Sequence, residues 1–459
     1  AHGRSLGISQ WHRAVENAGI DKQLRSGAIE FHRAVEAGAV GFWIVADFVH
    51  ETDARRLQRG LQYNPAGKIV ILEQPLTDSF EPLPAGFVVV DGAPLSHSLI
   101  PLLGSGVPGI LITRSQAKVL KPGMELILDG TTGLLTTDLS VPISPFEPLV
   151  AGDVLATRDG EAVSLRVSAR SQRDVRYAAE FGAEAIGLLR SEFLVPEDKR
   201  VPDASFYRAA FRKLGETAAG MPLTIRLFDV AASKRPSWLR LAPADAGVLG
   251  RQGVRLFADE PVHDIYLAQL EAISALVKEF DVRVLLPYVA DLAELQYWYD
   301  DIRRQLVYPP SVGAMAETPA AALQLHEWLE VVEFAAIGCN DLMQCLFGAD
   351  RDEPELHRYL DPYAPALYRF LKQVADLVQD RLDAIQLCGV LPQLPGILPL
   401  LLGLGYRVFS VEASLLPYLR STITATHAGE ACMLAKRVCR ARSSVAVRQI
   451  LGQNAQRLS

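Results

Sequence analysis

The feature that most constrains the fold is an alternation of short apolar segments with longer amphipathic ones from about residue 160 onward. The expected strands are residues 163–168, 184–190, 222–229, 282–288, 311–316, 332–338, 384–388 and 406–411. Expected helices lie between most of them, at 172–182, 262–280, 291–306, 319–329 and 362–380. About eight such units over about 300 residues predict a TIM (β/α)8 barrel, with a doubly wound open sheet as the alternative. Polar residues at the ends of many strands, rather than at one switch point, favour the barrel.

Two further regions precede the predicted barrel. Residues 68–140 contain short β-branched segments separated by turns rich in Gly, Pro and Asp, which predicts a small α/β domain. Residues 8–62 have apolar residues at helical spacing, including Val45, Phe48 and Val49, which predicts a helical packing element. The predicted division is a helical segment at 1–62, an α/β domain at 63–145 and a barrel at 150–459, with linkers near 62–66 and 140–148.

Composition narrows the class of protein. The 459 residues imply two to three domains, and 49% hydrophobic with 22% charged residues is ordinary for a soluble globular protein. The sequence has no apolar run of membrane-span length and no secretory pattern, so we expect a cytoplasmic protein that does not bind membranes. A net charge of −7 argues against general nucleic-acid binding. Five cysteines without a Cys-x-x-Cys pair argue against a disulfide framework or structural zinc.

Two of the expected strands run into carboxylates. Residues 312–315 lead to Glu317, and residues 331–338 lead to Asn340 and Asp341. A barrel places the carboxyl ends of its strands, and its chemistry, on one face. Carboxylate oxygens there suit a hard divalent cation such as Mg²⁺ that holds a phosphorylated acid. The structural alternative for both carboxylates is helix capping or ion pairing with nearby arginines.

Other strand ends carry arginines and a cysteine. Arg190 and Arg226 end two expected strands, and Arg351 follows the segment that contains Asp341. Planar guanidinium groups match carboxylate and phosphate oxygens, so several of them at one rim favour an anion pocket over solvated surface positions. Cys388 ends another strand. A buried cysteine is usually a small hydrophobe, but a thiol with a pKa of about 8.5 can also protonate a carbanion.

A histidine stands out in the small domain. His97 follows an expected strand and a tight turn and opens a helix-like stretch. A lone histidine is more often structural, but a helix N-terminus is an anion site. An imidazole with a near-neutral pKa can act as a nucleophile toward phosphorus, which makes His97 a catalytic candidate.

Together these segments resemble the phosphoenolpyruvate-utilising family, which includes phosphotransferase-system Enzyme I, phosphoenolpyruvate synthase and pyruvate phosphate dikinase. The resemblance runs from about residue 40 to the end and rests on separated motifs in the family's order, such as Gly182 to Phe193. It is closest to Enzyme I, because the chain has no room for an ATP-grasp domain. The resemblance implies a swivelling phosphohistidine domain before a barrel that binds phosphoenolpyruvate.

The resemblance also implies a role for each candidate residue. His97 would be the phosphorylated histidine and Cys388 the proton donor to pyruvate enolate. The implied Mg²⁺ ligands are Glu317 and Asp341. The implied substrate-binding positions are Arg190, Arg226, Asn340, Arg351 and Gln252.

Three positions depart from the family pattern. Gln252 stands where the family has an arginine, Leu95 where a threonine precedes Ser-His, and Val390 where a glutamate follows Cys-Gly. A charged hydrogen bond contributes about 1.5–3 kcal/mol. Loss of several such bonds would slow the chemistry by orders of magnitude.

The predicted function is a phosphotransferase that moves the phosphoryl group of phosphoenolpyruvate to His97 and then to an acceptor, expected to be a phosphocarrier protein, with release of pyruvate. One alternative is a degenerate regulatory module that binds phosphoenolpyruvate with little turnover. Another is the phosphohistidine half of a split phosphoenolpyruvate synthase. The resemblance further implies a role in sugar transport, a shortened carrier-docking segment at the N-terminus and a possible homodimer through the barrel.

Overall fold

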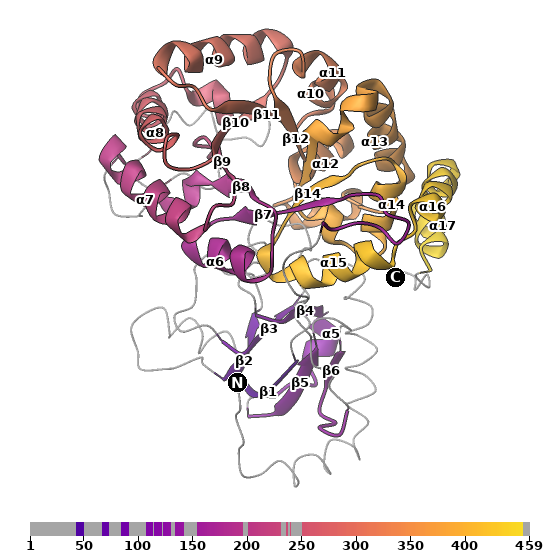
Figure 1. Cartoon of the computed structure of the whole chain (residues 1–459). Helices are drawn as coiled ribbons and strands as arrows, with labels where there is room; N and C mark the ends of the chain where they lie inside the picture. Colours follow the sequence, from indigo (N-terminus) through magenta and orange to yellow (C-terminus); the bar gives the residue numbers. More distant parts are fainter. Residues whose placement is uncertain are drawn as a thin grey trace.

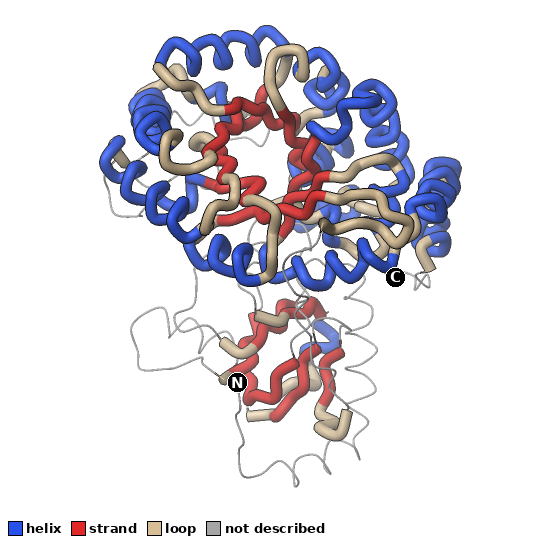
Figure 2. Tube along the Cα trace, viewed as in Figure 1, coloured by secondary structure: helices blue, strands red, loops and turns tan. Residues whose placement is uncertain are grey.

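The structure is a computed structural model of the chain (Figure 1). It describes residues 43–49, 67–72, 84–90, 107–112, 114–121, 123–129, 134–141, 154–195, 201–230, 236, 239 and 250–452. In this part of the chain a closed ring of strands is surrounded by helices, and a separate sheet lies beside it (Figures 1 and 2).

The ring is a barrel of eight strands, and every neighbouring pair is parallel. This confirms the predicted TIM barrel and excludes the open sheet, because β10 and β9 close the circle. The strands are β7 (Ser164–Ala169), β8 (Ile186–Arg190), β9 (Leu223–Arg226), β10 (Val282–Val289), β11 (Ser311–Ala316), β12 (Phe334–Gly338), β13 (Ile385–Cys388) and β14 (Val408–Val411).

Helices alternate with the strands and form the outer layer (Figure 2). They are α6 (Gln172–Glu180), α7 (Ala204–Thr217), α8 (Val262–Leu276), α9 (Leu292–Gln305), α10 (Pro319–Leu323), α11 (Leu325–Trp328), α12 (Cys339–Phe347), α13 (Pro365–Val378), α14 (Ile397–Gly403), α15 (Leu416–Ala425), α16 (Ala428–Arg440) and α17 (Ser444–Ile450). No described helix has both the length and the apolar character of a membrane span.

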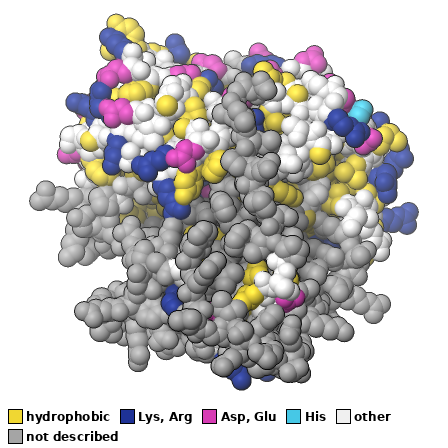
Figure 3. All heavy atoms as spheres, turned by 60° about the horizontal axis from the view of Figure 1, so that its bottom comes forward, with side chains coloured by type: hydrophobic (Ala, Val, Ile, Leu, Met, Phe, Trp, Pro, Cys, Tyr) yellow, Lys and Arg dark blue, Asp and Glu magenta, His cyan; other side chains and the backbone are white. Residues whose placement is uncertain are grey.

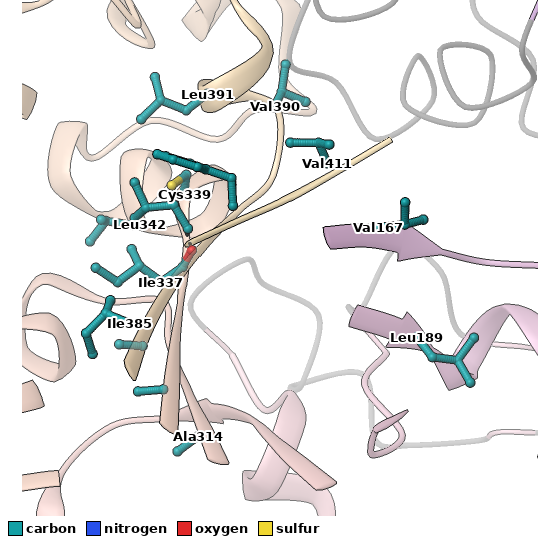
Figure 4. Packing of buried hydrophobic residues seen from close by; sticks show 14 of the residues in the cluster. Val167, Leu189, Ala314, Ile337, Cys339, Leu342, Ile385, Val390, Leu391 and Val411 are labelled. Carbon is teal, nitrogen blue, oxygen red and sulfur yellow. Dashed lines mark hydrogen bonds between the residues drawn. The ribbon is translucent and has the colours of Figure 1, made fainter. Parts of the chain in front are cut away.

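The barrel strands serve two cores, because successive side chains on a strand point to opposite faces. One core is a small cluster formed by Leu188, Leu285, Met315, Ala336 and Cys388. The other lies between strands and helices, where Ile337, Ile385 and Val411 belong to one cluster with Cys339 and Leu342 (Figure 4). Burial of each large aliphatic side chain contributes about 1.5–3 kcal/mol, so both layers hold the ring closed.

The smaller sheet has the strand order β4-β3-β2-β1-β5-β6. Its elements are β1 (Trp43–Val49), β2 (Lys68–Leu72), β3 (Gly86–Val90), β4 (Gly109–Ile112), α5 (Arg114–Ala117), β5 (Glu125–Asp129) and β6 (Leu134–Thr136). Its alternating residues separate into two clusters. Val70, Leu72, Phe87 and Val89 join the cluster that includes the barrel, and Ile69, Ile71, Val88 and Val90 form a second one.

The helical prediction for Val45, Phe48 and Val49 was wrong, because Trp43–Val49 is a strand. It pairs in parallel with β2 and antiparallel with β5, and so lies inside the sheet. Periodicity alone cannot separate a short, mostly apolar run such as this one from a segment of a buried helix. The predicted boundaries at 1–62, 63–145 and 150–459 otherwise stay predictions. Residues 1–42, the expected hinge at 62–66, most of 140–148, and His97 lie outside the described residues.

Figure 3 shows the molecule from the side of the smaller sheet. In the described part of this face, Lys and Arg lie interspersed with Asp and Glu, and hydrophobic side chains lie between them. Charge is therefore mixed over this surface.

Close packing of α14 against α16 generates a stability prediction. A Cβ on Gly403 would overlap the carbonyl group of Ala431, a backbone atom that cannot turn aside. We expect Gly403→Ala to lower the free energy of unfolding by about 1–3 kcal/mol or more in urea denaturation. The control is Gly429→Ala in α16, where the nearest atoms belong to the exposed ring of His427 at 3.3 Å. Equal losses in both variants would contradict the packing argument.

Candidate functional site

The closed barrel brings the predicted site residues to one rim. Arg190 and Arg226 are the last residues of β8 and β9 and are register partners. Glu317 directly follows β11, and Asn340 and Asp341 lie in the first turn of α12, directly after β12. Cys388 ends β13, opposite Gly338 of β12. All these positions are carboxyl ends of parallel strands, the face on which this fold builds its sites.

Arg226 lies between two carboxylates. Its Nη1 is 2.8 Å from Asp229 Oδ2, and its Nη2 donates a short hydrogen bond to Glu192 Oε1. Burial opposes the charged form, but Glu192, Asp229 and Glu317 outweigh it and raise the pKa of Arg226. The guanidinium is therefore charged and held in a fixed orientation.

Arg190 is the less compensated cation. No carboxylate in the described part of the chain lies within ion-pair distance of it, and its guanidinium lies over the ring of Phe193 at 5.9 Å. Burial, together with repulsion from Arg226, lowers the pKa of Arg190 below that of an ordinary arginine. An anion bound next to Arg190 would remove this electrostatic cost.

Glu317 is buried with its carboxylate fixed from two sides. Its Oε2 accepts a hydrogen bond from Tyr288 N at 3.0 Å. Gly338 makes room for it, because a Cβ there would lie 2.6 Å from Glu317 Cγ. Burial and the neighbouring carboxylates Asp341 and Asp229 raise the pKa of Glu317 well above its ordinary value. The capping alternative does not apply to Glu317, because Thr318 is the N-cap of α10.

Asp341 forms an ion pair with Arg351. Arg351 Nη2 lies 3.1 Å from Oδ1 and 3.2 Å from Oδ2 of Asp341. The backbone N–H of Arg351 donates to Gln344 Oε1 at 3.0 Å, which ties the loop after α12 back to that helix. Asp341 therefore pairs with an arginine, as the structural alternative from the sequence predicted. The same contact brings Asp341 and Arg351, two predicted site residues, together.

Asn340 and Gln252 also lie in this region. Asn340 Oδ1 accepts a hydrogen bond from Val390 N at 3.0 Å, and the left-handed φ of +103° at Gly389 lets the chain pass close to the Asn340 side chain. Gln252 is buried and hydrogen-bonds the side chain of Tyr288. Gln252, which departs from the family pattern, therefore contacts Tyr288, the residue whose backbone N–H binds Glu317.

Cys388 is buried and points into the barrel interior. Its Sγ accepts a hydrogen bond from Gln386 Nε2 at 3.0 Å. Burial raises the pKa of Cys388 to about 12, although the hydrogen bond from Gln386 and the charge of Arg190 act in the opposite direction. The thiol therefore keeps its proton near neutral pH, as a general acid must.

Sequence reasoning missed four residues that shape the site: Glu192, Asp229, Tyr288 and Gln386. Glu192 and Asp229 stand two and three residues beyond arginines that were singled out, so the signal for them was present. Tyr288 has a φ of 52°, which is uncommon for a non-glycine residue and has no signature in the sequence.

The residues present fit a magnesium ion. Four carboxylates, Glu192, Asp229, Glu317 and Asp341, face three guanidinium groups in this region, which leaves one negative charge in excess among the described residues. The described residues contain no cluster of three or more His, Cys, Asp and Glu side chains arranged for a metal. Two carboxylates nevertheless suffice for Mg²⁺, which usually keeps several waters and takes further oxygens from a substrate phosphate. Because the pKa of Glu317 is raised, a cation bound beside this carboxylate would lower the electrostatic cost of ionising it.

Glu317→Gln tests this site without an activity assay. The folded state raises the pKa of Glu317 above 4.5, so ionised Glu317 costs stability, and the cost develops as pH rises above that value. We expect Glu317→Gln to raise Tm by about 2 °C or more at pH 8 without magnesium, and by less near pH 4.5. Added MgCl₂ should raise the Tm of the wild type but not that of the variant.

The matched control is Glu333→Gln. Glu333 also accepts a backbone N–H, from Val312 at 2.9 Å, but it precedes β12 and so lies at the opposite ends of the strands. In the Glu333→Gln variant, MgCl₂ should raise Tm as it does in the wild type. A magnesium response that survives in Glu317→Gln would contradict the assignment.

Comparison with known proteins agrees with this geometry. The profile of the family described as "PEP-utilising enzyme, PEP-binding domain" matches residues 151–428, more than half of the chain. The phosphoenolpyruvate-protein phosphotransferase of Streptomyces coelicolor is 31% identical over 354 residues, which cover 74% of this chain and 62% of that protein. The protein of the same name from Haloferax volcanii is 26% identical over 84% of this chain and 72% of its own length.

A multiphosphoryl transfer protein of Rhodobacter capsulatus is 25% identical over 97% of this chain and 56% of its own length. A solved citrate lyase structure from Burkholderia xenovorans aligns with 66% of this chain and 91% of its own, at 12% identity and a TM-score of 0.37, a likeness too low to carry an argument. This chain therefore spans only 62% of the Streptomyces relative and 56% of the multiphosphoryl transfer protein. The match over 151–428 shows that the chain belongs to the family of phosphoenolpyruvate-utilising enzymes.

Proposed function

We propose that this chain moves the phosphoryl group of phosphoenolpyruvate to His97 and releases pyruvate. The observation that carries the proposal is the rim cluster, defined as Arg190, Arg226, Glu317, Asp341 and Arg351. The guanidinium groups of Arg226 and Arg351 are buried there beside the carboxylates, above a thiol that holds its proton. Such an arrangement suits a small acid that carries both a phosphate and a carboxylate.

The rim cluster would bind the two anionic groups of the substrate. Arg190 and Arg226 would hold its phosphate, since neighbouring strand ends carry them, and no carboxylate among the described residues lies within ion-pair distance of Arg190. The Nδ2 group of Asn340 remains as a donor, because its Oδ1 already accepts from Val390. Mg²⁺, when bound by Glu317 and Asp341, would neutralise charge on the phosphoryl oxygens.

Two transfers complete the reaction, first of the phosphoryl group and then of a proton. An imidazole nitrogen of His97 attacks phosphorus, a nitrogen–phosphorus bond forms, and the bond from phosphorus to the enol oxygen breaks. The electron pair of that bond leaves on the enolate of pyruvate. The Sγ–H of Cys388 then gives its proton to the methylene carbon of the enolate, and the thiolate later takes a proton from water.

We propose that the acceptor of the phosphoryl group is a phosphocarrier protein. The relatives named phosphoenolpyruvate-protein phosphotransferase support this choice. His97 would reach the barrel and then the acceptor by movement of the smaller domain about linkers near 62–66 and 140–148.

A second candidate function is binding of phosphoenolpyruvate with little turnover. Gln252 favours it, because an amide that hydrogen-bonds Tyr288 stands where the family has an arginine. An amide has no charge to stabilise a developing phosphoryl transition state.

Phosphorylation of His97 is the direct test of the proposal. We expect incubation with phosphoenolpyruvate and MgCl₂ to add one phosphoryl group to the peptide that contains His97, detected by mass spectrometry under conditions that preserve phosphohistidine. His97→Ala should lose the label and keep phosphoenolpyruvate binding in calorimetry. Tight binding without any label in the wild type would favour the second candidate function instead.

Substitution of Gln252 separates the two candidates. Gln252→Arg restores a guanidinium beside Tyr288 and should raise the rate of pyruvate release by about tenfold or more, because a charged hydrogen bond contributes about 1.5–3 kcal/mol. Gln252→Leu is the control for loss of the amide without gain of charge, and it should not raise the rate. An unchanged rate in Gln252→Arg would show that the missing arginine does not limit turnover.

A further inference from the structure

Gln386 lies inside the barrel, directly below Cys388. The two residues are separated by one position on β13, so their side chains share the interior face of the strand. Gln386 is 2% exposed and Cys388 is 1% exposed. A fully buried amide in a strand of apolar residues costs free energy unless its hydrogen bonds are satisfied, so its partners identify what it does.

The orientation of the Gln386 amide is fixed by its neighbours. Its Nε2 donates both to the carbonyl oxygen of Gly187 and to Cys388 Sγ, each at 3.0 Å. Its Oε1 faces Arg166 Nη1 at 3.5 Å. A flipped amide would set Oε1 against the Gly187 carbonyl oxygen and Nε2 against a guanidinium, and neither pair can hydrogen-bond. The Nε2 group must therefore face the sulfur.

Arg166 and Gly187 support this orientation from behind. Arg166 Nε donates to Ser164 Oγ at 3.0 Å, which anchors the guanidinium near Gln386. Gly187 leaves the space that Gln386 occupies, because a Cβ there would overlap Gln386 Oε1 and lie 2.8 Å from Arg166 Cβ. Three strands, β7, β8 and β13, thus contribute to holding one amide against one thiol.

We propose that Gln386 is the positioning residue for the Cys388 thiol: its amide donates to a sulfur lone pair, so that the Sγ–H proton is directed toward the rim cluster and the sulfur keeps a donor after that proton leaves. This rests on the proposed role of Cys388 as proton donor to pyruvate enolate. The hydrogen bond costs nothing to reorganise when the thiolate forms, because Nε2 already faces the sulfur.

The contact itself is tested by the infrared S–H stretch of Cys388. The difference spectrum between the wild type and Cys388→Ala isolates this band from those of the other thiols. In Gln386→Met, which has similar length and no donor, the band should shift, because the sulfur lone pair loses its partner. Ser168→Ala is the matched control, since it removes another buried interior hydrogen bond, to Ser410 Oγ at 2.9 Å, and should leave the band in place. An unshifted band in Gln386→Met overturns the proposal.

The functional consequence is tested by deuterium exchange into the methyl group of pyruvate, followed by NMR with MgCl₂ present. Gln386→Met should lower kcat for exchange by about tenfold or more and leave KM for pyruvate unchanged, because the lost hydrogen bond is stronger to the charged thiolate than to the neutral thiol. Ser168→Ala should exchange like the wild type.

The outcomes separate this proposal from the proposed function. Deuterium exchange that survives in Cys388→Ala, or that is absent in the wild type, overturns the proton-donor role of Cys388. In either case the infrared band still tests whether Gln386 hydrogen-bonds the Cys388 sulfur. Exchange that is lost in Cys388→Ala but undiminished in Gln386→Met overturns only the positioning role of Gln386.

Discussion

Closure of the parallel barrel is the constraint on which the rest of the structure depends. Residues more than 190 positions apart in the sequence become hydrogen-bonded neighbours, as in the 199-residue separation between Gln386 and Gly187. Because every strand runs in the same direction, each turn from strand to helix delivers its polar residues to the same rim. The charged groups at the rim can be packed tightly because apolar layers inside and outside the strands hold the ring rigid.

Charge balance organises that rim. Arg226 is held by Glu192 and Asp229, and Arg351 holds Asp341, whereas neither Arg190 nor Glu317 forms an ion pair within the described part of the chain. Burial first, and like charges second, shift the pKa of Arg190 downward and that of Glu317 upward, toward their neutral forms. Burial raises the pKa of Asp229 as well. An anion bound beside Arg190, or a cation bound beside Glu317, would offset this electrostatic cost.

Much of the fold could be predicted because parallel barrel strands read as apolar runs that end in polar residues. The same rule explains the failure at Trp43–Val49, whose apolar run was assigned to a helix before its strand partners were known. Site residues at strand ends were predictable from the fold and the motifs. Tyr288 and Gln386 could not be predicted. The place of Tyr288 depends on a left-handed backbone conformation, and the role of Gln386 depends on partners from two distant strands. His97 and its domain movement stay predictions.

The ion pair between Asp341 and Arg351 has a consequence for ligand selection. A ligand that hydrogen-bonds Arg351 Nη2 competes with Asp341, which already supplies one negative charge at hydrogen-bond distance. A monoanion would exchange one ion pair for an equivalent one and gain almost nothing. A phosphate ester, which carries about 1.5 to 2 negative charges at neutral pH, gains from the exchange. At this nitrogen the protein's own carboxylate would therefore favour ligands that carry more than one negative charge.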